Sequence, residues 1–153
     1  MPNAFYTLAR DVFTTEFSSQ TGLASLSQIS GWFSANLGQL NTKLHTNFSG
    51  DASDMDSSAG AIFSLMYLQK YYERTASNAL RGIIQSNGVL SIGDGDNKIS
   101  FTNKNEVAKV FRGMANDTAN EIKDLVNKYN LYYASPRQVV GYDSPQYCED
   151  TFT

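Results

Sequence analysis

The stretch AIFSLMYLQKYYERTASNALRGI, residues 61–83, decides how this chain folds. Its apolar side chains recur every three or four positions, and in its first half they lie around more than one face of a helix. A helix that is apolar on several faces is buried by its neighbours on several sides. The sequence therefore predicts a central helix from Ala61 to about Ile84, against which the other helices pack.

Three further segments have the 3.6-residue period of amphipathic helices. Residues 5–18 and 23–48 precede the central segment, and residues 104–130 follow it. The last of these segments has Asn103 three residues ahead of Glu106, an arrangement typical of a capping box. The sequence thus predicts a mainly α fold, a helical bundle with long amphipathic helices.

The helical period is interrupted near residues 89–101. Apolar residues there flank the sequence GDGDNK, residues 93–98, in which Gly, Asp and Asn tolerate the positive φ of a tight turn. We expect one small β-hairpin or protruding loop in this region. Its charged residues Asp94, Asp96 and Lys98 are candidates for contact with a partner.

The final segment, residues 131–153, has no helical period and contains two prolines and five aromatic residues. The sequence therefore divides into a helical domain with the hairpin, residues 1–130, and an extended C-terminal arm, residues 131–153. Either the arm packs over its own helices, or it extends and places aromatic anchors in the pockets of a neighbouring chain. Proline keeps the backbone extended and unpaired, which favours the second interpretation. The candidate partner-binding residues of the arm are Tyr132, Tyr133, Pro136, Arg137, Tyr142, Pro145, Tyr147 and Phe152.

Catalytic and metal-binding constellations are absent from the sequence. His45 is the single histidine and Cys148 the single cysteine, so neither has the partners that zinc binding or nucleophilic catalysis requires. An EF-hand beginning at Asp94 would need an oxygen ligand where Lys98 stands and a glutamate where Asn105 stands. We therefore expect no enzyme activity, no catalytic residue, no metal and no cofactor. An enzyme using His45 or an aspartate cluster is a third, less favoured hypothesis.

Composition favours contact with proteins over contact with nucleic acid or lipid. Only 18% of the residues are charged and the net charge is −3, whereas a nucleic-acid binder needs a basic face. The nine Tyr and nine Phe suit protein interfaces, because aromatic rings bury large areas. The single cysteine favours a reducing compartment. No apolar run approaches the roughly 20 residues that span a bilayer, and the first residues lack the pattern of a signal peptide. We therefore expect a protein that is made in a cytoplasm and does not associate with a membrane.

The order of these features resembles that of head–tail connector, or neck adaptor, proteins of tailed bacteriophages. The resemblance covers about half to two-thirds of the chain. It rests on the central stretch 61–83, on LSIGDGDNKISFTNKNEVAKVFRGMANDTANEIKDLVNKYN (90–130), and on SPRQVVGYD (135–143). In that family a helical bundle, a projecting loop or hairpin and a C-terminal arm assemble into a ring below the portal.

The resemblance implies a virion protein of the phage neck, made in the host cytoplasm. It would form a homo-oligomeric ring, commonly of about twelve subunits, between the portal protein and a further neck or tail protein. DNA would pass through the ring without being specifically bound. By position, the arm from Tyr132 to Thr153 would dock on the portal, and the hairpin around Gly93–Lys98 would face the next ring or the lumen. The alternative is a chaperone-like or regulatory helical protein-binding module without a virion role.

Overall fold

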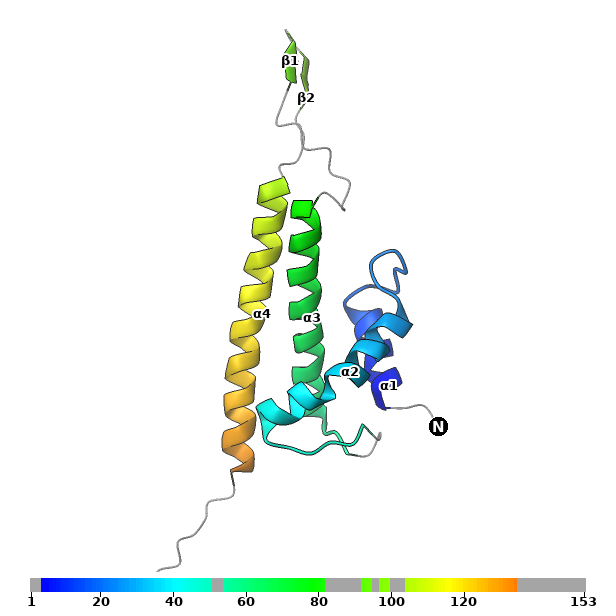
Figure 1. The fold of residues 1–153 in the computed structure, drawn as a ribbon, viewed down its shortest axis with the longest axis vertical. Coiled ribbons are helices and arrows are strands. Elements are labelled where there is room, and N and C mark those ends of the chain that lie inside the picture. The colour runs from blue at the N-terminus through cyan, green and yellow to red at the C-terminus, as the bar shows by residue number, and fades with distance from the viewer. Residues whose placement is uncertain (1–3, 51–53, 82–91, 95–96, 100–103, 135–153) are drawn as a thin grey trace, which may run out of the picture.

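The computed structural model describes residues 4–50, 54–81, 92–94, 97–99 and 104–134 of the chain. Within these residues the elements follow the order α1, α2, α3, β1, β2 and α4 (Figure 1). Their bounds are Ala4–Thr15 for α1, Leu26–Leu44 for α2, Ser57–Arg81 for α3, Ile92–Asp94 for β1, Asn97–Ile99 for β2 and Lys104–Tyr133 for α4. The predicted mainly α bundle is confirmed. None of the described helices is long and apolar enough to cross a membrane.

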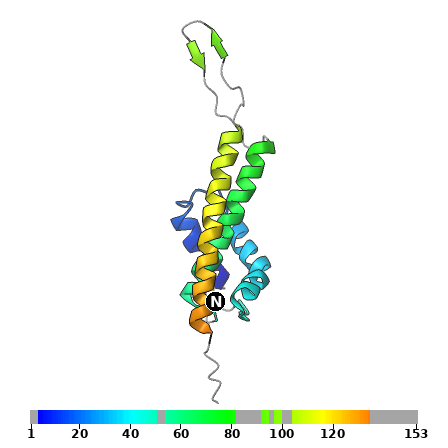
Figure 2. The same cartoon turned by 90° about the vertical axis from the view of Figure 1, so that its left-hand side faces the viewer.

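The longest helices, α3 and α4, lie side by side and run in opposite directions (Figures 1 and 2). The shorter α1 lies beside the N-terminal half of α3 on the side away from α4, whereas α2 crosses that half of α3 and reaches α4 with its C-terminal end (Figure 1). As predicted, α3 is the central helix, since it contacts α1, α2 and α4. It begins at Ser57, four residues ahead of the predicted start at Ala61.

Aromatic side chains dominate the core between α1, α2 and the first half of α3. Phe33 and Phe63 are fully buried, and their ring centroids lie 4.7 Å apart. Trp32 contacts both of these rings and also meets Tyr67 edge to face, with ring centroids 5.5 Å apart. Large apolar rings packed in this way supply much of the hydrophobic stabilisation of a small domain.

Helix α2 is shorter at both ends than the predicted segment 23–48. At its start, the Ser25 hydroxyl accepts a hydrogen bond from the Gln28 amide at 3.3 Å and caps the helix. At its end, His45 takes the left-handed conformation, with φ 53° and ψ 39°. Its backbone N–H donates to the Asn41 carbonyl. A left-handed residue ends an α-helix because it turns the chain out of the helical path.

Helix α4 extends three residues beyond the predicted end at Asn130. The Ala134 amide still donates to the Asn130 carbonyl at 2.8 Å, so the helical bonding includes Leu131, Tyr132 and Tyr133. Residues 131–133 are therefore part of the last helix and not of an extended arm. The apolar period is lost there because Leu131 and Tyr132 face solvent and do not continue the buried face.

The strands β1 and β2 pair antiparallel, with Ile92 opposite Ile99, Gly93 opposite Lys98 and Asp94 opposite Asn97. Figure 1 places them beyond the C-terminal end of α3 and the N-terminal end of α4. The rest of the predicted hairpin, at residues 89–91, 95–96 and 100–101, lies outside the described residues.

Candidate protein-binding site

Asp56 occupies the position where the start of α3 meets the end of α4. Its Oδ1 accepts a hydrogen bond of 2.6 Å from the Ala59 amide and so caps α3. A carboxylate is favoured there because the N-terminus of a helix carries a partial positive charge. The residue needed to begin the central helix is therefore also a fixed negative charge beside α4.

Two tyrosines of α4 use the other oxygen of the same carboxylate. The Tyr129 hydroxyl donates to Asp56 Oδ2 at 3.1 Å, and the Tyr133 hydroxyl donates to it at 2.9 Å. Residues four apart lie on one face of a helix, which brings the two rings to a centroid separation of 4.5 Å. Asp56 thus joins the first turn of α3 to the last turn of α4.

This arrangement favours the neutral form of both phenols. Burial raises the pKa of Tyr129 to about 12, and the hydrogen bond to Asp56 and the negative charge of that residue act in the same direction. The hydrogen bond to Asp56 is the main reason why the pKa of Tyr133 is also raised. Both hydroxyls therefore remain hydrogen-bond donors near neutral pH.

A further bond joins the end of α4 to the end of α2. The side-chain amide of Asn130 donates to the Lys43 carbonyl at 3.0 Å. That carbonyl belongs to the last turn of α2, where backbone oxygens have no partner within the helix. The end of α4 is thus bonded to two neighbouring segments, and its backbone position is well defined up to the point where the arm follows.

An open hollow of about 450 Å³ lies beside this junction, between the first turns of α3 and the last turns of α4. Its lining is largely apolar and aromatic, and comprises Ser58, Ala61, Ile62, Leu125, Lys128, Tyr129, Tyr132 and Tyr133. Tyr132, which lines this hollow, is 83% exposed, and Leu131 in the same turn of α4 is 78% exposed. Both are more exposed than any other large hydrophobic residue that the structure describes. Exposed apolar side chains beside a hollow are typical of a surface that binds another protein.

The predicted arm residues have different outcomes. Tyr132 and Tyr133 lie in the last turn of α4 and line the hollow described above. The other predicted arm residues, Pro136, Arg137, Tyr142, Pro145, Tyr147 and Phe152, lie outside the described residues. Of the predicted hairpin residues, Asp94 lies in β1 and Lys98 lies in β2, while Asp96 is outside the described part of the chain.

Asp56 and Tyr129 are residues of this candidate site that the sequence did not single out. A carboxylate just ahead of a helix is expected to act as its cap. Asp56 does cap α3, but its bonds to Tyr129 and Tyr133 span 73 and 77 residues of sequence. The spacing of Tyr129 and Tyr133, one helical turn apart, is the one local signal of a shared partner.

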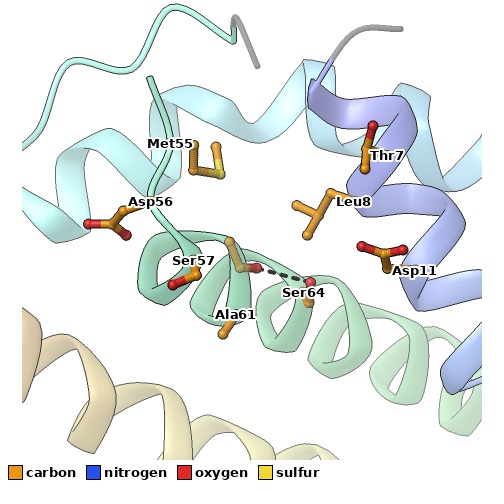
Figure 3. Close-up of a pocket in the computed structure, with 9 residues that line it drawn as sticks. Thr7, Leu8, Asp11, Met55, Asp56, Ser57, Ala61 and Ser64 are labelled. Carbon is orange, nitrogen blue, oxygen red and sulfur yellow. Dashed lines mark hydrogen bonds between the residues drawn. The ribbon is translucent and has the colours of Figure 1, made fainter. Parts of the chain in front are cut away.

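A second open hollow, of about 570 Å³, lies on the α1 side of the first turns of α3 (Figure 3). Leu8 of α1 points into it, and the Ser64 hydroxyl donates to the Gly60 carbonyl at 3.0 Å along α3. In Figure 3 the Asp56 carboxylate points away from this hollow, in agreement with its bonds to α4. None of the hydrogen bonds at this hollow joins the hydroxyl of a lining serine or threonine to the carboxylate of Asp11 or Asp56.

The candidate catalytic and metal-binding residues show no such arrangement in the described ranges. His45 is exposed at the end of α2, and Cys148 lies outside the described residues. Of the acids at 51–56, Asp54 accepts a hydrogen bond from Ser49, while Asp56 caps α3. Within residues 4–50, 54–81 and 104–134, and in the short strands, no group of three His, Cys, Asp or Glu is placed to hold a metal ion.

Comparison of the chain with protein-family models, with curated proteins and with solved structures gives no match.

Proposed function

We propose that this protein is a non-enzymatic structural subunit that binds other protein chains through the end of α4. The observation that carries the proposal is the exposure of Leu131 and Tyr132 in the last turn of α4, where Tyr132 also lines the hollow at the Asp56 junction. Leaving such side chains in water is unfavourable, and burying them against a partner recovers hydrophobic free energy. The helix that presents them is bonded to α2 and α3, so little conformational freedom has to be lost on binding.

The resemblance to phage neck adaptors makes this proposal more specific. The protein would then form a ring of about twelve subunits between the portal and the tail components, with DNA passing through. The segment from Tyr132 to Thr153, which begins in the last turn of α4, would dock on the portal, and the region of Asp94 and Lys98 would meet the next ring or the lumen. A net charge of −3 suits a channel in which DNA slides without adhering. The order of long helices, a short strand pair and an arm after α4 supports this assignment.

The test is binding of the full-length chain to the portal protein of the same phage, measured by co-sedimentation. Removal of residues 135–153 leaves α4 complete and should abolish the complex. In the full-length chain, the double substitution Leu131→Ser with Tyr132→Ser should weaken binding at least tenfold. The matched control is Leu23→Ser, which removes a large hydrophobic residue that is also exposed, at 51%, but lies between α1 and α2. Normal portal binding by the chain with both serine substitutions would refute binding through the end of α4, and normal binding by the truncated chain would refute docking through the arm.

A helical module that caps a partner transiently is the second candidate. The open, largely apolar hollow between Ile62 and Leu125 favours it, since such a hollow accepts a side chain of a partner without ring assembly. Mass spectrometry of purified particles distinguishes the two functions. A neck subunit is present in every particle in a fixed copy number, whereas a transient module is absent from particles.

A further inference from the structure

A separate groove runs between α2, α3 and α4, away from the Asp56 junction. It consists of two adjoining hollows of about 230 and 190 Å³, which share Lys43 and Gln69. A cavity of about 150 Å³ holds a benzene ring, so each hollow has room for an aromatic side chain. The first hollow is also lined by Ala119, Ile122, Lys123, Val126 and Asn127, and the second by Trp32, Gln39, Met66 and Lys70.

The groove has a mainly apolar first hollow, a more polar second hollow and lysines at its rim. Met66 and Ile122 are buried beneath it. Lys43 and Lys123 are exposed at its rim and form no ion pair within the described part of the chain. Lys70 has a partner, because its ammonium lies 2.8 Å from Glu73 Oε2. A partly apolar groove with two unpaired lysines at its rim suits a peptide that carries both aromatic rings and carboxylates.

The chain contains one segment of that chemistry. Residues 147–153 read YCEDTFT, in which Glu149 and Asp150 stand between Tyr147 and Phe152. The two aromatic rings, five positions apart, would each occupy one of the two adjoining hollows. The acids between them carry charges opposite to those of Lys43 and Lys123. The remainder of the arm, residues 135–146, carries only Arg137 and Asp143 as charges and has no comparable acidic pair.

We infer that the groove of one subunit receives residues 147–152 of a second copy of this chain. Val126 precedes Ala134 by eight residues, so α4 carries the chain about 12 Å past the groove before the arm begins. In the proposed ring identical subunits lie side by side, so the segment would have the groove of a neighbouring copy within reach, and binding there would also join the two subunits. The thirteen residues from 135 to 147 reach at most about 45 Å, which is enough to cross to an adjacent subunit.

The inference rests on the proposed function, because a ring places identical subunits side by side. It adds a second role to the arm. Residues near Pro136 and Tyr142 would contact the portal, while residues 147–152 would join one subunit to the next.

Cross-linking through cysteine tests the inference in the full-length chain, since Cys148 is the only native cysteine and lies within the proposed segment. Asn127 is exposed and lines the groove, so Asn127→Cys places a second thiol at the binding site. A chain with Asn127→Cys and Cys148→Ser is mixed with the unaltered chain and oxidised mildly. Any disulfide between positions 127 and 148, identified by mass spectrometry, then joins two different copies.

The matched control for position is Glu106→Cys with Cys148→Ser. Glu106 is exposed on the same helix, but it lies 21 residues, or about 31 Å, from Asn127. We expect the cross-link from position 127 to exceed that from position 106 at least tenfold. Adding Lys43→Glu and Lys123→Glu should remove this excess, and Glu149→Lys with Asp150→Lys in the other chain should restore it. Circular dichroism confirms that each variant is folded.

Two results would overturn the inference. Equal cross-linking from positions 106 and 127 would show that the groove does not hold the segment. In a chain carrying Asn127→Cys and native Cys148, a disulfide formed only within single chains would show that the segment binds its own subunit. Portal co-sedimentation is measured separately, so specific cross-linking without portal binding would refute the proposed function and leave the inference intact.

Discussion

The two halves of the α3–α4 pair differ in how they are packed (Figure 1). In the aromatic half, residues 57–72 and 116–133, α3 is also covered by α1 and α2 and buries large side chains such as Phe63. In the alanine half, residues 73–81 and 104–115, α3 and α4 mainly face each other. The buried apolar residues there are Ala76, Ala79, Ala108 and Ala115.

The larger hydrophobic residues of the alanine half are partly or largely exposed. Val110 is 61% exposed, Leu80 is 42% exposed, and Phe111 is half-buried against the Tyr72 ring. Hydrophobic stabilisation grows with the apolar area removed from water, and an alanine has little area to bury. The difference teaches that the aromatic half carries most of the stability of the fold, while the alanine half depends on it.

The largest expected effect is that of Phe63→Ala. Truncation of a fully buried phenylalanine should lower the free energy of unfolding by about 3–5 kcal/mol, measured by urea denaturation. The matched variant in the alanine half is Phe111→Ala. It removes a half-buried ring that stacks on Tyr72 and should cost about 1 kcal/mol. Equal losses would show that the two halves contribute alike.

A smaller effect is expected at the Asp56 junction, which closes the aromatic half. Asp56→Ala removes the cap of α3 and the acceptor of both tyrosine hydroxyls, so it should cost about 1–2 kcal/mol in the same assay. Asp56→Asn retains a capping oxygen and should cost less than about 1 kcal/mol. If Asp56→Asn costs as much as Asp56→Ala, the negative charge and not the cap is the main contribution.

The pH dependence of stability tests the environment of Tyr129. Its pKa is about 12 in the folded chain and 10.0 in the reference state, so folding favours the protonated phenol. The resulting stabilisation is complete below pH 10 and is lost as the pH rises from 10 to 12. Tyr129→Phe should remove this part of the alkaline loss, measured as the denaturation midpoint against pH. An unchanged alkaline profile in Tyr129→Phe would contradict the assignment.

The smallest effect is expected at the surface of the alanine half. Val110→Ser replaces an exposed side chain and should change the free energy of unfolding by no more than about 0.5 kcal/mol.

Amide hydrogen exchange should also be faster at residues 106–114 than at residues 118–128 of the same helix. Slower exchange in the first range would show that the alanine half is the more stable one.

The existence of the helices could be read from the sequence, because each buries one face with a 3.6-residue period. Their ends were less predictable. Apolar residues continue past His45, so periodicity extended α2 into a segment that the left-handed backbone of His45 separates from it. At the end of α4 the opposite occurred, since Leu131 and Tyr132 are helical but not buried, and periodicity reports only burial.

The candidate site was predictable only in part. Tyr132 and Tyr133 stand out in the sequence as aromatic residues beside a proline-containing terminus. Their relation to Asp56 depends on the antiparallel arrangement of α3 and α4, which no local pattern encodes. The same holds for the groove with Lys43 and Lys123, because its walls come from three helices.

The hydrogen bonds of Asp56 have a mechanical consequence. A pull on the arm acts on α4 at Ala134, one residue beyond Tyr133, whose hydroxyl is bonded to Asp56 at the start of α3. Tension along the axis of α4 is therefore passed to the neighbouring helix within the last turn. This tension would slide α4 along α3 and load all their contacts together, and would not pull the two helices apart one turn at a time. The load enters the fold in its aromatic half, where α3 is also held by α1 and α2.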